Sequence, residues 1–307
     1  MNLEDQYKNI VEGQENQASN QQLGTVNMDR FKPNTASDAD LVLGFHTIEV
    51  NSLPSAGMFY TDDIKIQIRS AKVAEIRHFS SIDETNVFDV DEKLNYILEA
   101  CVQVTSDKRR LSYKDLLEED RFFLILSIRD LTFPEPESNL TVEHVDKRGD
   151  KHQIEIKKDY FTYFKIPDTL DKYYDSERKS FMIETKSFGT IEMRPPTIGV
   201  MQKMTKYIKD SQEEKKKLDQ SVIQVMPYMA TNWRGLDDKS IFKFEIEMNG
   251  WSNKKFSLIY KLAEQMKVGI KPDMSVQIGD DVEEVPIGFR DGIKSLFIVQ
   301  DFTSELL

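Results

Sequence analysis

The chain has 307 residues, of which 39% are hydrophobic and 31% charged, and its formal net charge is −12. This length fits either two packed units or one large α+β body with insertions. The negative charge argues against a protein that coats nucleic acid, because binding to phosphates needs a clustered Lys and Arg surface. The single cysteine, Cys101, excludes an intrachain disulfide and a cysteine-rich zinc site, and it fits a reducing cytoplasm. With no signal-peptide pattern and no run of about 18 apolar residues, we expect neither export nor a membrane span.

Residues 1–40 are rich in Asn, Gln, Glu, Asp and Ser, and they carry few apolar residues. Such a segment cannot bury enough apolar surface to offset the entropy lost on ordering. We therefore predict a flexible polar N-terminal arm. The alternative is an arm that folds against a neighbouring protein.

The most specific local feature is the sequence Leu-Pro-Ser-Ala-Gly-Met-Phe-Tyr at residues 53–60. Pro54 fixes φ and Gly57 can adopt positive φ, so the backbone is predicted to turn sharply there. The run that follows, residues 64–68, alternates Ile with polar residues, which is the period of a half-buried strand. This region is built for shape and contains no nucleophile, general base or metal ligand.

Two amphipathic helices are predicted next. Residues 90–104 place Cys101 on an apolar stripe, so the thiol is expected to pack as a small hydrophobe rather than to react. A capping box at Ser112 and Asp115 is expected to open a second helix that ends near Leu131. Asp120 lies near the apolar side of that helix, and Arg129 follows nine residues later. Because a buried carboxylate needs partners, we interpret both as structural tethers, and an active-site role for Asp120 is the alternative.

The rest of the chain reads as hairpins and further helices. Hairpins are predicted at 140–156, 181–193 and 274–287, and helices at 197–208, 218–229 and 256–266. Residues 241–248 satisfy both the strand and the helix period, and the polar tract 209–217 is expected to be a solvated face or an exposed loop. The predicted fold class is α+β, with β-hairpins packed on amphipathic helices. We expect the arm at 1–40, an α+β domain at 41–196 with a strand, two helices and a β-rich insertion, and a mainly helical domain at 197–307 with the terminal hairpin.

Residues that could support chemistry are sparse. The four histidines match no zinc spacing, although His144 and His152 flank one predicted turn and could face each other. Adjacent carboxylates, such as Glu118–Glu119 and Asp237–Asp238, point apart in a helix or strand, so we interpret them as solvated rather than as an acid and base pair. Phosphate-loop, dinucleotide and nucleophile-elbow motifs are missing from the sequence. We therefore predict no catalytic, cofactor-binding or metal-binding residues.

The order of these parts resembles the baseplate hub family of T4-type contractile-tailed bacteriophages. The resemblance rests on Leu53–Tyr60, the strand 64–68, the helix carrying Ile97–Val102 and the run Asp120–Arg129, and less distinctly on residues 269–289. It covers about residues 41–302 in pattern, but only the first two blocks are specific. Some phage proteins of similar layout carry Cys-x-x-Cys knuckles near the corresponding hairpins. This chain has no cysteine there, so no zinc role is carried over.

The resemblance implies a non-enzymatic structural protein of the virion tail baseplate, assembled in the host cytoplasm with other tail and hub proteins or with copies of itself. The residues expected at such an interface are Leu53, Pro54, Gly57, Phe59 and Tyr60, with packing inside the chain as the alternative for each. Within the same family, the chain could instead be an assembly chaperone that is missing from the mature virion. A tail-associated cell-wall hydrolase is a third hypothesis from a different functional class.

Overall fold

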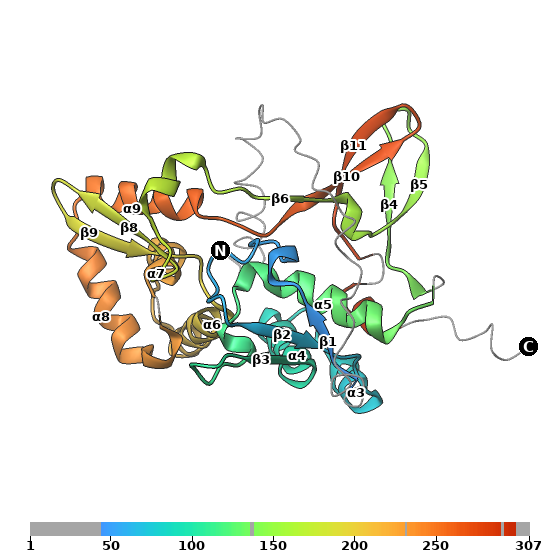
Figure 1. The fold of residues 1–307 in the computed structure, drawn as a ribbon, viewed down its shortest axis with the longest axis horizontal. Helices are drawn as coiled ribbons and strands as arrows, with labels where there is room; N and C mark the ends of the chain where they lie inside the picture. The colour runs from blue at the N-terminus through green and yellow to red at the C-terminus, as the bar shows by residue number, and fades with distance from the viewer. Residues whose placement is uncertain (1–43, 136–137, 231, 290–291, 299–307) are drawn as a thin grey trace, which may run out of the picture.

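The computed structural model describes residues 44–135, 138–230, 232–289 and 292–298 (Figure 1). The arm predicted at 1–40 lies outside the described residues. The described part is an α+β fold, as predicted, and all of its strand pairings are antiparallel. None of the helices within these ranges is long and apolar enough to cross a membrane.

A three-stranded sheet begins the described chain and positions the 53–60 loop. It consists of β1 (His46–Ile48), β2 (Lys65–Ile68) and β3 (Val102–Thr105), in that order. The predicted alternation at 64–68 is confirmed, because Ile64, Ile66 and Ile68 are buried, whereas Lys65 is exposed and Gln67 is half-buried. Helices α4 (Val87–Cys101) and α5 (Glu118–Thr132) pack against this sheet, and α3 (Val73–Ser80), which the sequence reading missed, packs on α4.

The helix predicted at 90–104 is shifted in the structure. Asn86 caps α4 three residues earlier than predicted, and its side chain accepts from the backbone N–H groups of Phe88 at 3.0 Å and Asp89 at 3.4 Å. The helical prediction is wrong for residues 102–104, because Val102 and Val104 alternate into β3 and pair with β2. Cys101 is fully buried, as its stripe indicated, and burial raises the pKa of its thiol to about 11.

The capping box at Ser112 forms, but it caps a separate turn. Tyr113–Asp115 is a single 3-10 turn in which Asp115 accepts from the Ser112 N–H at 2.9 Å. Leu116 and Leu117 are then extended, and Leu117 bridges to Thr197, so α5 begins only at Glu118. The prediction of one helix continuous from Ser112 is therefore corrected to a turn, a bridge and a helix.

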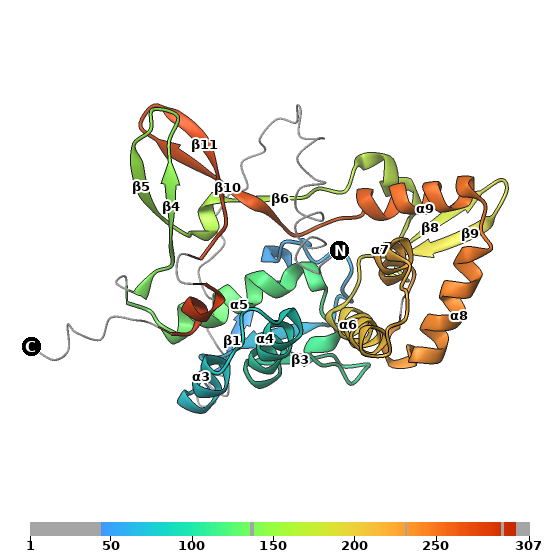
Figure 2. The same cartoon turned by 180° about the vertical axis from the view of Figure 1, so that it is seen from behind.

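The three predicted hairpins are confirmed. Their strands are β4 (Thr141–Val145) with β5 (Lys151–Glu155), β8 (Ser180–Thr185) with β9 (Gly189–Met193), and β10 (Ile270–Ile278) with β11 (Asp281–Pro286). Short strands extend two of them: β6 (Phe161–Tyr163) pairs with β10, and β7 (Tyr174–Asp175) pairs with β8. Figures 1 and 2 show the β4–β5 and β10–β11 hairpins projecting side by side at one end of the molecule, with β8–β9 at the other end.

Four helices form the remainder: α6 (Ile198–Glu213), α7 (Gln220–Met229), α8 (Asp238–Asn249) and α9 (Asn253–Gln265). The α6 helix begins next to Thr197, as predicted, and Thr197 caps it; Pro227 lies inside α7, two residues before its end. The ambiguous residues 241–248 are helical. Asp237 decides this locally, because its carboxylate accepts from the N–H of Ser240 at 2.8 Å and starts α8.

The two parts predicted to meet at 196/197 share strands and core. β6 lies before that boundary and pairs with β10 after it. The N–H of Arg194 donates to the carbonyl of Tyr228 at 2.8 Å, and the N–H of Ile198 donates to the carbonyl of Leu116 at 2.8 Å. Buried apolar residues from both parts belong to one cluster. The described residues thus form one packed body across 196/197.

Candidate functional site

The loop at 53–60 is a series of tight turns. The N–H groups of Ala56, Met58 and Tyr60 donate to carbonyls three residues back, at 2.7, 3.2 and 3.1 Å. Ala56 and Gly57 both have positive φ, of 51° and 74°. A Cβ on Gly57 would lie 2.9 Å from Val50 Cγ1, so glycine is required there for space as well as for backbone conformation.

Asp120, at the start of α5, binds this loop through hydrogen bonds that its carboxylate accepts. Its Oδ1 accepts from the Ser55 N–H at 2.9 Å, and its Oδ2 accepts from the Ser55 Oγ and Tyr60 hydroxyls, each at 2.7 Å. The Tyr60 hydroxyl in turn accepts from the Leu117 N–H at 2.9 Å. All of these groups are buried. Asp120 is therefore a tether between α5 and a loop some 60 residues earlier.

The burial of this network moves two pKa values in the same direction. Desolvation raises the pKa of the Asp120 carboxyl, and the hydrogen bonds from Tyr60 and Ser55 oppose that rise. Desolvation, then the Asp120 charge, raises the pKa of Tyr60 well above its usual value. The Tyr60 proton is consequently retained, and the phenol serves as a donor to Asp120 rather than as a base.

Three of the five residues expected at an interface point into the chain itself. Leu53, Phe59 and Tyr60 are 3%, 2% and 4% exposed. The Phe59 ring packs edge-on against Tyr174 and Phe181, with centroids 5.9 and 5.8 Å apart. The expectation that these side chains face another protein is thus corrected to packing within the chain, because Phe59 packs on β7 and β8 and Tyr60 bonds to Asp120 of α5.

The other two expected interface residues, Pro54 and Gly57, are half-buried, and Ala56 between them is exposed. They form the solvent side of the loop. An interface at this loop stays a prediction, and it would use the backbone and small side chains of 54–57 rather than the aromatic residues.

Arg129, the second predicted tether, acts at the opposite end of α5. It is 3% exposed, its guanidinium donates to the carbonyl of Ser138, and it lies 5.7 Å from the centre of the Phe133 ring. Burial lowers its pKa. The two predicted tethers therefore do not pair with each other: Asp120 holds the 53–60 loop, and Arg129 holds the segment that leaves α5.

The sequence reading missed the charged residues next to Asp120. Glu118, predicted to be solvated, pairs with Arg121 at 3.0 Å, and Arg121 pairs with Asp91 of α4 at 2.6 Å. Desolvation raises the pKa of the Glu118 carboxyl and, more strongly, that of Glu119. The solvated reading of this pair is wrong, because the first turn of α5 lies between α4 and the 194–198 segment. No local pattern marks this, since the burial comes from distant residues.

His144 and His152 are partners across the β4–β5 register, as suspected, but each bonds a carboxylate. His144 Nε2 lies 2.8 Å from Glu283 Oε2 on β11, and His152 Nε2 lies 3.0 Å from Asp146 Oδ2. Among the described residues, no group of three or more His, Cys, Asp or Glu side chains is placed to hold a metal ion. These histidines therefore join strands and a turn, and His144 joins the two hairpins.

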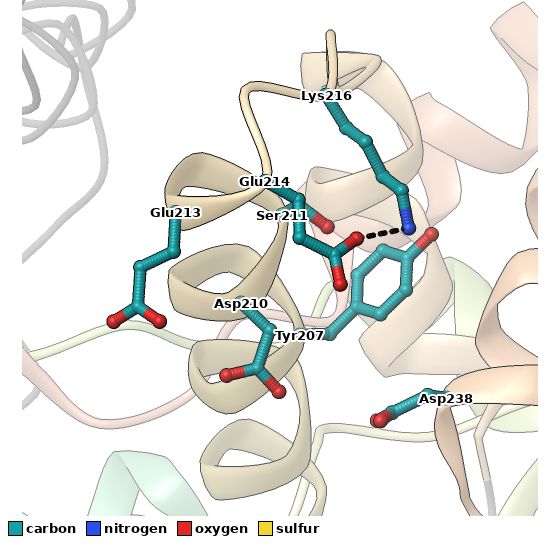
Figure 3. Close-up of a pocket in the computed structure, with 7 residues that line it drawn as sticks. All are labelled: Tyr207, Asp210, Ser211, Glu213, Glu214, Lys216 and Asp238. Carbon is teal, nitrogen blue, oxygen red and sulfur yellow. Dashed lines mark ion pairs between the residues drawn. The ribbon is translucent and has the colours of Figure 1, made fainter.

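A pocket of about 260 Å³ lies between the end of α6 and the start of α8 (Figure 3). Its polar lining includes Asp210, Glu214 and Asp238, and Figure 3 shows Lys216 directed at Glu214. The Tyr207 hydroxyl donates to Glu245 at 3.0 Å, and desolvation with this carboxylate raises its pKa to about 12. Half of the tract predicted as solvated, up to Glu213, is the last turn of α6. The acids in the pocket are largely matched by lysines, and its tyrosine stays protonated.

These residues therefore form a shape-determining centre, made of a turn loop, the buried carboxylate that binds it and charged pairs around the start of α5. Asp120, Tyr60 and Glu118 are each engaged in bonds within the chain. Glu119, whose pKa burial raises well above its usual value, has one buried carboxylate oxygen without a hydrogen-bond partner among the described residues. Comparisons of the chain with family models, with curated proteins and with solved structures each found no match.

Proposed function

We propose that this chain is a structural component of the baseplate hub of a contractile bacteriophage tail and acts by protein–protein contact during virion assembly. The observation that carries the proposal is the 53–60 loop. It is the most specific part of the resemblance, and Asp120 fixes its shape through three hydrogen bonds. A loop that is rigid before binding loses little entropy when it docks, which suits a part locked into an assembly.

The proposed partners are other tail and hub proteins and copies of the chain itself, and nucleic acid is not among them. The proposed location is the tail baseplate of the virion, after assembly in the host cytoplasm. The proposal assigns no enzymatic role. It is supported by the bonds of Asp120, Tyr60 and Arg121 within the chain, which give these ionisable groups a structural role.

Quantitative mass spectrometry of tails purified from a phage that encodes this chain tests the proposal. A structural component is expected at a constant copy number relative to a major tail protein. Absence from finished tails, with presence in assembly intermediates, would assign the chain to the chaperone alternative. Hydrolysis of purified cell-wall material by the recombinant chain, abolished by exchange of one carboxylate, would assign it to the hydrolase class.

A variant at the loop links this test to the structure. Ala56→Arg places a large charge on the exposed side of the 53–60 loop, and arginine occupies the positive φ of Ala56 no worse than alanine does. We expect the variant to fold and to be lost from tails. The matched control is Ala74→Arg, because Ala74 is also exposed but lies on α3.

A further inference from the structure

Arg194, between β9 and α6, is half-buried, and its guanidinium bonds to none of the described residues. Its Nε is shielded from solvent and has no hydrogen-bond partner, whereas its two terminal nitrogens are not shielded. Arg121 and Arg129 also have a buried Nε without a partner, but Arg121 pairs with two carboxylates and the Arg129 guanidinium donates to a carbonyl. A half-buried charge without a partner is costly, so Arg194 needs an explanation that bonds within the described chain do not provide.

The groups around Arg194 do not neutralise it. Burial lowers the pKa of Arg194, and the phenols of Tyr60 and Tyr174 and, less strongly, the Glu119 carboxyl oppose this shift, so all three lie nearby. The Tyr60 hydroxyl donates to the buried carboxylate at the start of α5, and the Tyr174 hydroxyl donates to a carbonyl of the 53–60 loop. Glu119 acts on Arg194 through its charge and not through a hydrogen bond. The terminal nitrogens of Arg194 are therefore available to a group from outside.

Arg109 brings a second guanidinium to the same place. It lies in the exposed loop after β3, and its side chain forms no ion pair with any described residue. After burial, the positive charge of Arg109 is a further cause that lowers the pKa of Arg194, so the two groups lie close enough to repel each other. Asp63 fixes the loop, because it accepts from Ser106 Oγ at 2.5 Å and from the Asp107 N–H at 3.1 Å. Two neighbouring cations without a counter-charge favour the binding of an anion.

We propose that Arg194 and Arg109 form a binding site for a carboxylate, carried by an acidic side chain of another protein, at the edge of the 53–60 loop. The two terminal nitrogens of Arg194 donate to the two carboxylate oxygens, which is the geometry that a guanidinium favours. Arg109 adds its charge from the exposed loop. The place of the site follows from Tyr60, which ends the 53–60 loop, and from Tyr174, which bonds to a carbonyl of that loop.

The surrounding charge favours an anion with a single negative charge over a phosphate. Asp120, the carboxylate that bonds to Tyr60, lies close to this place, and the whole chain has a net charge of −12. A phosphate dianion or a nucleic-acid strand brings more negative charge against these groups than one carboxylate does. The inference does not rest on the baseplate proposal, because it concerns the purified chain alone. A chain that binds no carboxylate and is nevertheless found in tails would overturn the site and leave the proposed function intact.

Thermal unfolding of the full-length chain, with acetate replacing chloride at constant ionic strength, tests the site. Acetate is the probe because it presents a carboxylate alone. We expect acetate to raise the Tm of the parent chain, because a ligand that binds only the folded state stabilises it. Arg194→Met keeps a long side chain without the charge, and it should raise the apparent dissociation constant for acetate at least tenfold. The matched control is Lys254→Gln with Lys261→Gln, two exposed cations of α9 without ion pairs among the described residues, and it should respond as the parent chain does.

The same variant separates binding from packing. A half-buried charge that no carboxylate matches does not stabilise the fold, so Arg194→Met should be as stable as the parent chain in chloride. Arg109→Gln should weaken the acetate response less than Arg194→Met does, because Arg109 is exposed. A variant that is less stable in chloride, or one that responds to acetate as the parent chain does, overturns the proposal. So does a response to phosphate that is stronger than the response to acetate and depends on Arg194.

Glu119 is the competitor within the chain, because one of its carboxylate oxygens is buried without a partner among the described residues. A double-mutant cycle of Arg194→Met and Glu119→Gln in chloride measures whether the two side chains pair in solution. We expect the effects of the two variants on stability to add. Strong coupling between them would assign the Arg194 guanidinium to Glu119 and overturn the site for an outside carboxylate.

Discussion

The 53–60 loop and the pair of projecting hairpins are both held by hydrogen bonds to carboxylates, but they differ in how deeply those bonds are buried. Asp120 is fully buried beneath the loop and accepts three hydrogen bonds. The hairpins β4–β5 and β10–β11 are joined by His144 and Glu283, whose side chains are 16% and 8% exposed, and at their tips by the exposed pair Arg148 and Asp281. A buried polar group is costly when left unpaired, whereas an exposed pair exchanges its partner for water at little cost. The loop should therefore be rigid and sensitive to mutation, and the exposed tips of the hairpins tolerant.

The largest effect is expected at Asp120. Asp120→Ala leaves the Ser55 and Tyr60 donors buried without an acceptor, and we expect a loss of about 3 kcal/mol or more in the free energy of unfolding. Chemical denaturation measures it. Ser55→Ala is the graded control, because it removes one of the hydroxyl donors and should cost about 1 kcal/mol. A smaller loss for Asp120→Ala than for Ser55→Ala would contradict the tether.

Gly57 gives the next effect. Gly57→Ala forces a Cβ to within 2.9 Å of Val50 Cγ1 at a φ of 74°, and the expected cost is about 2 kcal/mol. Gly149→Ala is its matched control in the β4–β5 turn, where φ is 90° but a Cβ would meet nothing within 4 Å. The control measures backbone strain alone. Equal losses of stability in the two variants would mean that the close approach to Val50 is not tight.

The sequence predicted the elements whose patterns are local. Three local patterns were enough to predict their elements: the Ile alternation of 64–68, the apolar stripe around Cys101 and the hairpin turn near Gly149. Each pattern repeats over a few neighbouring residues and so does not depend on distant contacts. Residues 241–248 fitted both periods, and only the cap at Asp237 and the packing on α6 decide for a helix. The predicted helix boundaries were wrong where tertiary contacts intervene, as at Leu117, which bridges to Thr197.

The sequence predicted which residues make up the candidate site, but it did not predict where their side chains point. Asp120 and Arg129 read as tethers because a charge on an apolar helix face needs partners. Which partners it has is decided by residues such as Ser55 and Tyr60, far away in the sequence. Leu53 and Phe59 looked like anchors for another protein, and they are anchors for this chain. Large apolar side chains in a turn indicate that the turn packs on something, but they do not indicate whether that surface belongs to the same chain or to another protein.

The hairpin contact gives a pH dependence. The hydrogen bonds from His144 and His152 lower the pKa values of Glu283 and Asp146, respectively. These contributions to stability are present above the unfolded carboxyl pKa of roughly 4, and they are lost as pH falls through the lower folded values. Acid should therefore release the hairpins.

His144→Gln tests this through hydrogen exchange of the β10 and β11 amides between neutral and acidic pH. The variant should show weaker acid sensitivity in these strands than the parent chain. His78→Gln is the control, because His78 stacks on Tyr96 with ring centroids 4.0 Å apart and joins no hairpin. If hydrogen exchange in His144→Gln and in the parent chain responded identically to acid, the contact between His144 and Glu283 would not be the cause of the pH dependence.

The smallest effect is expected for the pair at the hairpin tips. Arg148 and Asp281 lie 3.8 Å apart, with side chains 71% and 54% exposed. Ordering two exposed side chains costs nearly as much as their screened attraction gains. Arg148→Ala should thus change the free energy of unfolding by less than about 0.5 kcal/mol, measured by denaturation at low and at high salt. A salt-sensitive loss as large as that of Gly57→Ala would mean that the tips, like the loop, are held in one geometry, and the contrast between the two regions would disappear.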